Sequence, residues 1–186
     1  MKDRMDSFVS LLTPLRKSLI GYIRYLLWNK NDLEDALQNV LTEAYRKFGQ
    51  FNKGTNFKNW LFQVASFTVF NMNRRYEKET VTERPLINAM EPIAVELLQN
   101  EEDYQKLLNN DLSFLKKVSD EAKASLNTLN QKERSVFLLH SIGELSYAEI
   151  ADTLEMPIGS VMSYLSRARA KLREQLIHYA KEGGYL

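Results

Sequence analysis

The sequence lacks cysteine altogether, which excludes disulfide bonds and thiolate chemistry. Histidine is almost as scarce: His140 and His178 stand far apart without obvious carboxylate partners, so we interpret both as ordinary helix residues. We find no metal-ligand set, nucleophile triad or glycine-rich phosphate loop. The sequence therefore predicts a protein that is not an enzyme, with no cofactor, no metal and no small-molecule substrate.

Membrane signals are missing as well. No apolar run approaches the roughly 18 residues that a helix needs to span a bilayer. The first residues, MKDRMDSF, lack the charged and then apolar layout of a secretory signal. We therefore expect a cytoplasmic protein.

Charge is unevenly distributed, although the formal net charge is only +1. Residues 1–80 hold 13 Lys and Arg against 8 Asp and Glu, residues 81–120 hold 4 against 8, and residues 121–186 hold 8 of each. A basic beginning, an acidic middle and a mixed end indicate two functional lobes around a connector.

Apolar residues recur at spacings of three and four, and no alternating strand pattern or internal repeat appears, so the fold class is all-α. Pro14 predicts a kink or break in the first helix. The capping-box pattern predicts that Asn31 and Glu34 begin the second helix, and Thr55 or Asn56 is expected to cap the third. The expected helices are 6–28, 31–48, 56–79, a short helix at 94–109, and those that follow Glu121.

Two short helices joined by a tight turn are predicted between Ser146 and Leu172. Ser146 and Glu149 form a capping-box pattern, and Pro157 suits the start of the second helix. The inner face of the first helix is assigned to Ala148, Ile150, Ala151 and Leu154, and that of the second to Val161, Leu165, Ala168, Leu172 and Leu176.

The outer face of the second helix is polar and then basic, which is the layout of a DNA-reading helix-turn-helix. A surface helical hairpin with a solvated charged face has the same pattern, because such stripes are common in helical bundles. Asn130 and Glu133 predict the cap of the helix that precedes this pair.

Residues in both lobes resemble regions 2 and 4 of bacterial RNA polymerase sigma factors of the extracytoplasmic-function (ECF) type. The region 4 matches are Leu126, Leu129, Glu133, Arg134, Val136, Phe137, Leu145, Ser146, Tyr147, Glu149, Ile150, Ala151, Leu154, Pro157, Gly159, Ser160, Val161, Ser163, Leu165, Ser166, Arg167, Ala168, Arg169 and Leu172. The region 2 matches are Asp32, Glu34, Asp35, Ala36, Gln38, Ala44, Phe51, Phe57, Trp60, Leu61, Val64, Ala65, Arg74 and Arg75.

This resemblance implies two helical domains joined by a flexible linker: a region 2 bundle of three or four helices at 1–79, an acidic linker at 80–120, and a region 4 helix-turn-helix at 121–182. The implied partners are core RNA polymerase, through its β′ clamp and β flap, and promoter DNA. Family members are often held inactive by an anti-sigma protein, so the resemblance implies an anti-sigma protein as a third partner.

The resemblance also implies the roles of individual residues. Asp35, Gln38 and Asn39 would dock on the β′ clamp helices. The loop 51–56 and the helix after it would open the −10 element and hold flipped-out bases, while the helix from Pro157 would enter the major groove at the −35 element. The residues assigned to DNA are Lys53, Asn56, Lys58, Phe62, Arg74, Arg75, Ser160, Met162, Ser163, Tyr164, Arg167, Arg169 and Lys171.

The chemistry of the first lobe fits this role, because aromatic faces can stack on unpaired bases and nearby cations can neutralise phosphates. The helix at 56–79 has more aromatic residues than one stripe can bury. Trp60 is assigned to the core, and at least one of Phe62, Phe67 and Phe70 is expected to face outward.

Met162 and Tyr164 stand where the family usually has basic residues. Base reading is then expected from Ser160 and Ser163, with an apolar contact between Met162 and thymine methyl groups. The loss of basic residues motivates one alternative, a decoy that binds an anti-sigma protein and never touches DNA. A second alternative is a DNA-binding repressor that uses only the helix-turn-helix.

Overall fold

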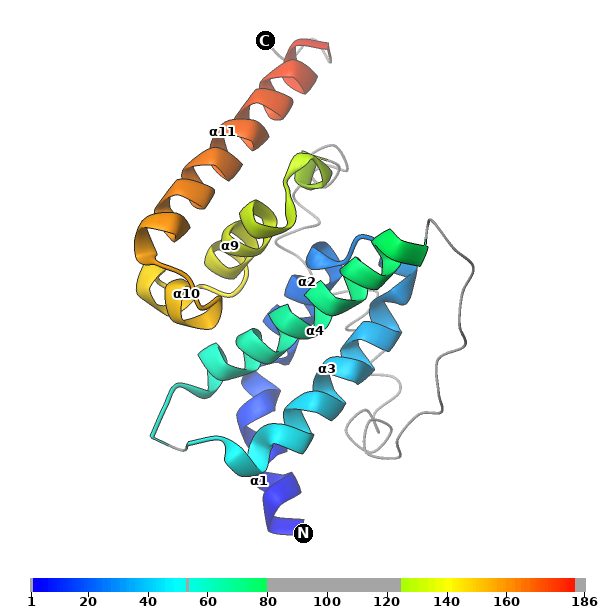
Figure 1. The fold of residues 1–186 in the computed structure, drawn as a ribbon, viewed down its shortest axis with the longest axis vertical. Coiled ribbons are helices and arrows are strands. Elements are labelled where there is room, and N and C mark those ends of the chain that lie inside the picture. The colour runs from blue at the N-terminus through cyan, green and yellow to red at the C-terminus, as the bar shows by residue number, and fades with distance from the viewer. Residues whose placement is uncertain (1, 53, 80–124, 183–186) are drawn as a thin grey trace. The chain divides into compact units, whose positions relative to one another are not determined.

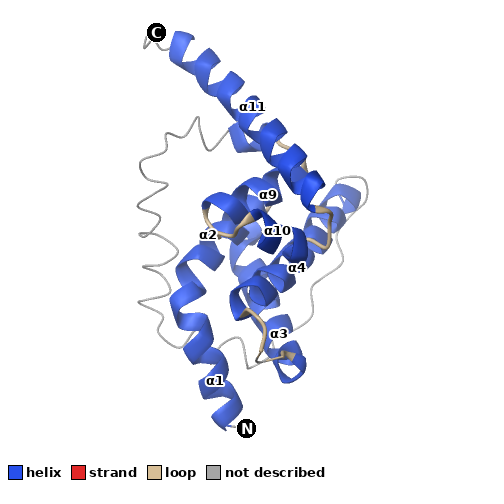
Figure 2. Cartoon of the chain, turned by 90° about the vertical axis from the view of Figure 1, so that its left-hand side faces the viewer, coloured by secondary structure: helices blue, strands red, loops and turns tan. Residues whose placement is uncertain are grey.

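Helices account for all the regular secondary structure in the residues that this computed structural model describes, which are 2–52, 54–79 and 125–182 (Figures 1 and 2). The all-α fold class is thereby confirmed. The chain divides into two compact units, the first within residues 1–111 and the second within 112–186. Among the described helices, none is long and apolar enough to cross a membrane.

The first unit consists of four α-helices connected by short 3₁₀ turns. In the labels of Figure 1 they are α1 (Lys2–Leu12), α2 (Arg16–Leu26), α3 (Leu33–Lys47) and α4 (Phe57–Glu79). The helix expected at 6–28 is therefore two helices, separated by the 3₁₀ turn Thr13–Leu15. Pro14 causes this break, because it has no backbone N–H to continue the helical hydrogen bonds.

The helix starts follow the expected caps only in part. Asn56 Oδ1 accepts hydrogen bonds from the backbone N–H of Lys58 and of Asn59, so the cap of α4 is confirmed. The capping box at Asn31 and Glu34 is wrong. The 3₁₀ turn Lys30–Asp32 occupies this stretch, and Asn29 caps it by accepting from the Asn31 N–H.

The core of the first unit gathers where α2, α3 and α4 pack together. Tyr22 is fully buried, and its hydroxyl lies 2.7 Å from Ser66 Oγ, which in turn donates to the carbonyl of Phe62. Burial raises the pKa of Tyr22, while the hydrogen bond with Ser66 opposes that rise. This pair explains a serine inside α4: it satisfies a tyrosine hydroxyl that would otherwise be buried without a partner.

A buried asparagine joins α4 to the end of α2. Asn73 Nδ2 donates to the Leu26 carbonyl at 3.1 Å, and Asn73 Oδ1 accepts from the Trp28 N–H at 3.1 Å. Both backbone groups lie where α2 has ended, so they have no helical partner there. One amide side chain thus satisfies two polar groups at the end of α2.

The second unit contains α9 (Gln131–Ser141), α10 (Tyr147–Thr153) and α11 (Ile158–Glu182). Two capping boxes begin its first two helices, Asn130 with Glu133 and Ser146 with Glu149, and both predictions are confirmed. The apolar stripe of α11 is confirmed for its described side chains, since the buried residues are Val161, Leu165, Ala168 and Leu172.

The inner face of α10 differs from the expectation. Ile150 and Leu154 are buried, but Ala148 is exposed, Ala151 is half-buried, and the buried neighbour is Thr153. Ile150 and Thr153 are three residues apart and so lie on the same side of the helix. The sequence misled here because alanine fits either face.

Two turns in this unit constrain their residues. A Cβ on Gly143 would lie 2.6 Å from the Leu139 carbonyl oxygen, so no side chain fits there without a shift of the backbone. Glu155, between α10 and α11, has φ 50°, a left-handed conformation that is uncommon outside glycine. The turn at Gly143 precedes α10 and the turn at Glu155 precedes α11, so the two turns determine the directions of these helices.

Some predictions fall outside the described residues. They are the helix at 94–109, the linker at 80–120 and Lys53. The domain boundaries 1–79 and 121–182 also stay predictions.

Candidate nucleic-acid interface

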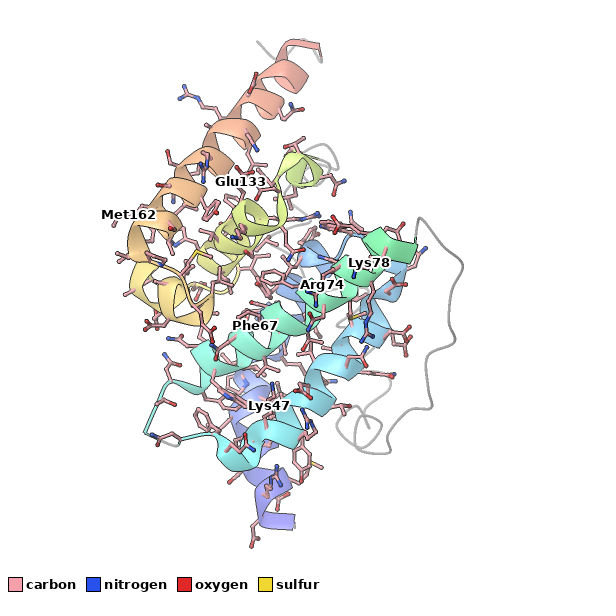
Figure 3. All side chains as sticks on the ribbon, in the orientation of Figure 1. Lys47, Phe67, Arg74, Lys78, Glu133 and Met162 are labelled. Atoms are coloured by element: carbon pink, nitrogen blue, oxygen red, sulfur yellow. The ribbon has the colours of Figure 1, made fainter. Side chains whose placement is uncertain are left out.

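The outer face of α11 carries the residues predicted to read duplex DNA. Met162 is 50% exposed and projects from the side of α11 away from α9 (Figure 3). The other predicted residues on this helix are exposed or half-buried: Ser160, Ser163, Tyr164, Arg167, Arg169 and Lys171. None of them is sealed in the core, so the outer face of α11 is accessible along the described part of the helix.

Tyr164 lies between two cations. The guanidinium of Arg167 lies 4.8 Å from the centroid of the Tyr164 ring, and Lys132 Nζ from α9 lies 6.0 Å from it. Cations within about 6 Å of an aromatic ring are attracted by its quadrupole. The tyrosine thus brings a lysine of α9 to the basic face of α11.

Glu133 of α9, labelled in Figure 3, also connects α9 to α11. Its side chain is only 3% exposed, Lys171 Nζ lies 2.7 Å from its Oε2, and Arg167 Nε lies 3.7 Å from its Oε1. Burial raises the pKa of Glu133, but the hydrogen bonds from Lys171 and the Asn130 N–H and the charges of Lys171 and Arg167 outweigh it, so the pKa is lowered.

This contact changes the interpretation of Lys171. We predicted a DNA contact, but its ammonium group is already bound to a carboxylate inside the unit. A lysine held in this way contributes less net charge to a phosphate than a solvated one. Arg169, on another side of the helix, is exposed.

In the first unit, the turn before α4 lies over a cluster of aromatic rings. Phe51 stacks on Phe48 at 6.0 Å between centroids, and its ring lies 5.1 Å from Trp60 and 5.4 Å from Phe57. The described residues of this turn, 52 and 54–56, are exposed. Trp60 is half-buried in the cluster, so its assignment to the core holds for one side of the ring.

The aromatic residues of α4 separate into a buried and an exposed set. Phe62 has no exposed surface and packs edge-on against Tyr22, so the predicted contact between Phe62 and DNA is wrong. Phe67 is 39% exposed and packs edge-on against Phe70. Figure 3 shows Phe67 and Arg74 on α4, and Phe67 and Tyr76 are the large aromatic side chains that this helix leaves exposed.

The cations of α4 lie near its end. Arg74 and Arg75 are exposed, and Arg74 Nη2 donates to Asn71 Oδ1 at 2.8 Å. Lys58 is half-buried in the first turn, while Asn56 is exposed with its side-chain oxygen occupied as the helix cap. The exposed ring of Phe67 and the exposed cations Arg74 and Arg75 thus lie on one helix, a combination of groups that single-stranded nucleic acid can use.

The outer face of α3 carries the residues predicted to bind polymerase. Asp35 and Asn39 are exposed, Gln38 is half-buried, and Asn39 Nδ2 lies 3.9 Å from Met72 Sδ. Further along, the hydrogen bond from Arg46 and the contact with Lys47 lower the pKa of Glu43 to about 2. The face is therefore polar and accessible at Asp35.

Sequence reasoning missed three residues of the second unit. Lys132 and Glu133 belong to another helix than the basic face, and their distance to it depends on packing that no local pattern reveals. Ile158 is 46% exposed on the outer face of α11. An isoleucine on a face that is otherwise polar could have indicated a contact residue from the sequence alone. Among the described residues, no group of three His, Cys, Asp or Glu could hold a metal.

Comparisons with known proteins match the two ends of the chain to two different regions of one protein family. Residues 11–79 match the family model "Sigma-70 region 2" and residues 119–172 match "Sigma-70, region 4". The chain is 27% identical to the RNA polymerase sigma factor YlaC of Bacillus subtilis over 98% of both chains. It is 23% identical to the ECF RNA polymerase sigma factor SigW of the same species, over 94% of this chain and 91% of SigW.

Two solved structures share the fold. One is the sigma factor RpoE in complex with the anti-sigma factor NepR from Bartonella quintana, with a TM-score of 0.65 and 24% identity over 95% of this chain and 98% of that one. The other is CnrH in complex with the cytosolic domain of CnrY, with a TM-score of 0.62 and 19% identity over 93% and 89%.

Proposed function

The chain belongs to the sigma-70 family of bacterial RNA polymerase sigma factors, in its ECF group, and from this premise we propose that it binds core RNA polymerase and promoter DNA to direct transcription initiation. Sigma factors are non-enzymatic regulators. The chain itself then contributes recognition and strand separation, while the polymerase carries out the chemistry.

The second unit binds the −35 element as duplex DNA. The observation that carries this proposal is the accessible amino end of α11, since the residues of its first turns are exposed or half-buried except Val161. Recognition helices place their amino-terminal residues against base edges in the major groove. Arg167 and Arg169 follow one to two turns later, where they meet phosphates.

The first unit holds the separated −10 element. An exposed aromatic ring at Phe67, near the exposed cations Arg74 and Arg75, suits a single strand whose bases are unstacked. In the turn before α4, Phe51 belongs to the aromatic cluster, and residues 52 and 54–56 are accessible to solvent. Phe62 has no direct part in this contact, because it belongs to the core.

The outer face of α3 docks on the β′ clamp of the polymerase through Asp35, Gln38 and Asn39, and the second unit meets the β flap. An anti-sigma protein is a further partner: one of the solved structures with this fold holds a sigma factor bound to one. The charge of the chain suits a large partner with several binding surfaces, because residues 1–80 have a basic balance and residues 81–120 an acidic one.

A decoy that only binds an anti-sigma protein is the second candidate. The observation that favours it is the reduced charge of α11, where Met162 and Tyr164 are uncharged and Lys171 is bound to Glu133. Arg167, Arg169 and Lys132 keep cations on the surface, which favours the DNA-binding reading.

The test is transcription in vitro with core polymerase from the bacterium that encodes the chain. Promoter DNA is first selected from a random pool by the reconstituted holoenzyme, and run-off transcripts are then measured with and without the chain. Transcripts that require the chain support the proposal. Failure of the chain to bind core polymerase at low salt would contradict the proposed function. A chain that binds an anti-sigma protein but shows no salt-sensitive binding to promoter DNA would instead support the decoy.

A further inference from the structure

The first two turns of α11 carry two exposed apolar side chains. Ile158 is 46% exposed and Met162 is 50% exposed, the two highest values among the large hydrophobic residues that the structure describes as exposed. Residues four apart lie on the same side of a helix, so the two side chains form one patch, here called the Ile158–Met162 patch. Water meets this patch in the free protein, at a cost that scales with its apolar area.

The surroundings of the patch are open. A Cβ built on Gly159 would meet nothing within 4 Å, so no other described part of the second unit covers the helix at this residue. Ser163 Oγ donates to the Gly159 carbonyl, which leaves the oxygen of the hydroxyl free to accept. The amino end of α11 thus offers apolar surface beside a hydrogen-bond acceptor.

Cations continue the same side of the helix beyond the patch. Arg169 follows Met162 by seven residues and Arg173 by eleven, which are spacings of nearly whole helical turns, and both are exposed. An apolar amino end followed by arginines matches a helix whose first turns meet base edges and whose later turns meet phosphates. An apolar protein partner would not require the arginines.

The major groove offers one apolar group to such a patch. Each of the four bases presents polar atoms there, and only thymine adds a methyl group, at C5. Polar base edges opposite Ile158 and Met162 would lose water without gaining a hydrogen bond, which is unfavourable. The patch therefore discriminates against base pairs that lack a methyl group.

We propose that the Ile158–Met162 patch binds the C5 methyl groups of thymines in the duplex promoter element, so that this chain selects T·A pairs by their methyl groups. Four residues advance about 6 Å along the helix axis, close to two base-pair steps of about 3.4 Å. The two thymines therefore lie within one or two base pairs of each other. This inference rests on the proposed function and specifies the DNA that the second unit takes.

The test replaces thymine by deoxyuridine, which removes the methyl group and nothing else. Holoenzyme binding is measured on selected promoter DNA in which each thymine of the upstream element is replaced in turn. We expect binding to weaken about three- to fivefold at one or two positions, the loss expected for one buried methyl group. Restoring the methyl group as 5-methylcytosine, against an unmethylated cytosine at the same position, should strengthen binding by a similar factor.

Two variants connect the effect to the patch. Ile158→Ala and Met162→Ala should each bind thymine and deoxyuridine DNA equally at one position, whereas Arg169→Gln should weaken binding to both DNAs by the same factor. Alanine is a good helix former, so the exposed substitutions are expected to leave the circular dichroism spectrum unchanged.

Equal binding of thymine and deoxyuridine DNA by the unmodified holoenzyme would overturn the inference, as would a selected element without thymine. If Ile158→Ala and Met162→Ala weakened polymerase binding instead, the patch would be a protein contact and the inference would be wrong. Open complexes that form equally well on both DNAs would contradict this inference alone. A holoenzyme that forms no open complex would contradict the proposed function.

Discussion

Lys171 Nζ lies 2.7 Å from Glu133 Oε2, and this contact joins the middle of α11 to the first turn of α9. Glu133 also accepts from the Asn130 N–H, which makes it part of the α9 capping box. One buried carboxylate therefore holds the start of one helix and the direction of the basic helix beside it. The same carboxylate lies 3.7 Å from Arg167, so the position of this proposed DNA contact also depends on it.

Glu133→Gln should destabilise the second unit at neutral pH. The amide can still accept the capping hydrogen bond, but the charge that binds Lys171 is lost. Because Lys171 is partly exposed, we expect the free energy of unfolding to fall by only about 1–2 kcal/mol. Both tryptophans, Trp28 and Trp60, belong to the first unit, so hydrogen exchange of α9 peptides is the measurement. Glu174→Gln, an exposed change on α11, is the control.

The same substitution should alter the pH dependence. Because the pKa of Glu133 is lowered in the folded chain, its contribution is complete above the usual value of 4.5 and is lost as pH falls through the folded value. The difference between wild type and Glu133→Gln should therefore shrink as pH falls below about 4.5. A difference that stays constant down to pH 2 would contradict the ion pair.

Asn73→Ala should destabilise the first unit. It leaves the Leu26 carbonyl and the Trp28 N–H without their partner, which costs about 1–3 kcal/mol. Urea unfolding followed by tryptophan fluorescence measures this directly, because both tryptophans report on this unit. Asn71→Ala, on the exposed side of the same helix, should have little effect, and equal effects of the two changes would contradict the assignment.

Phe67→Ala should impair open-complex formation without affecting stability. The exposed ring is proposed to stack on an unpaired base, an interaction of about 1–3 kcal/mol. The rate and extent of opening are measured by 2-aminopurine fluorescence in the −10 element. Val9→Ala is a control of the same exposure, 39%, whose side chain cannot stack, and identical behaviour of the two variants would remove Phe67 from the site.

Asp35→Ala combined with Gln38→Ala should weaken binding to core polymerase. Asp35 is exposed and Gln38 is half-buried on α3, and neither belongs to the buried core, so we expect the double variant to keep the fold. We expect at least a tenfold loss, about 1.4 kcal/mol, by fluorescence anisotropy of labelled chain. Asp6→Ala, an exposed carboxylate on α1, is the control, and an unchanged affinity of the double variant would place the docking face elsewhere.

Lys132→Gln should reduce the salt dependence of promoter binding. If Lys132 reaches a phosphate beside Tyr164, the slope of log K against log salt should fall by about one unit. Lys30→Gln, an exposed lysine of the first unit, serves as the control. A slope that does not change would confine the phosphate contacts to α11.

Most of the fold could be predicted from the sequence because local patterns determine it. The boxes at Asn130 and Ser146 depend on two residues three apart, and the stripe of α11 follows the helical period. The start of α3 escaped prediction because Asn29 caps a 3₁₀ turn that contains Asn31, so α3 begins only after that turn.

The candidate site was harder to predict, because packing between helices decides which of its side chains are exposed and which are already paired. Phe62 is buried since α2 and α4 pack closely enough for its ring to meet Tyr22, so α4 buries a wider arc than one stripe. Lys171 is bound to Glu133 across 38 residues, and no spacing rule reveals that contact. Local sequence identified the exposed helices but not the contacts that their side chains make with other helices.

The most direct test of the central claim is permanganate reactivity of thymines in selected promoter DNA, with core polymerase and the chain added separately and together. The account predicts that thymines of the −10 element become reactive only when both are present. Thymines that stay unreactive in the presence of both, with no binding of the chain to core polymerase at low salt, would contradict it.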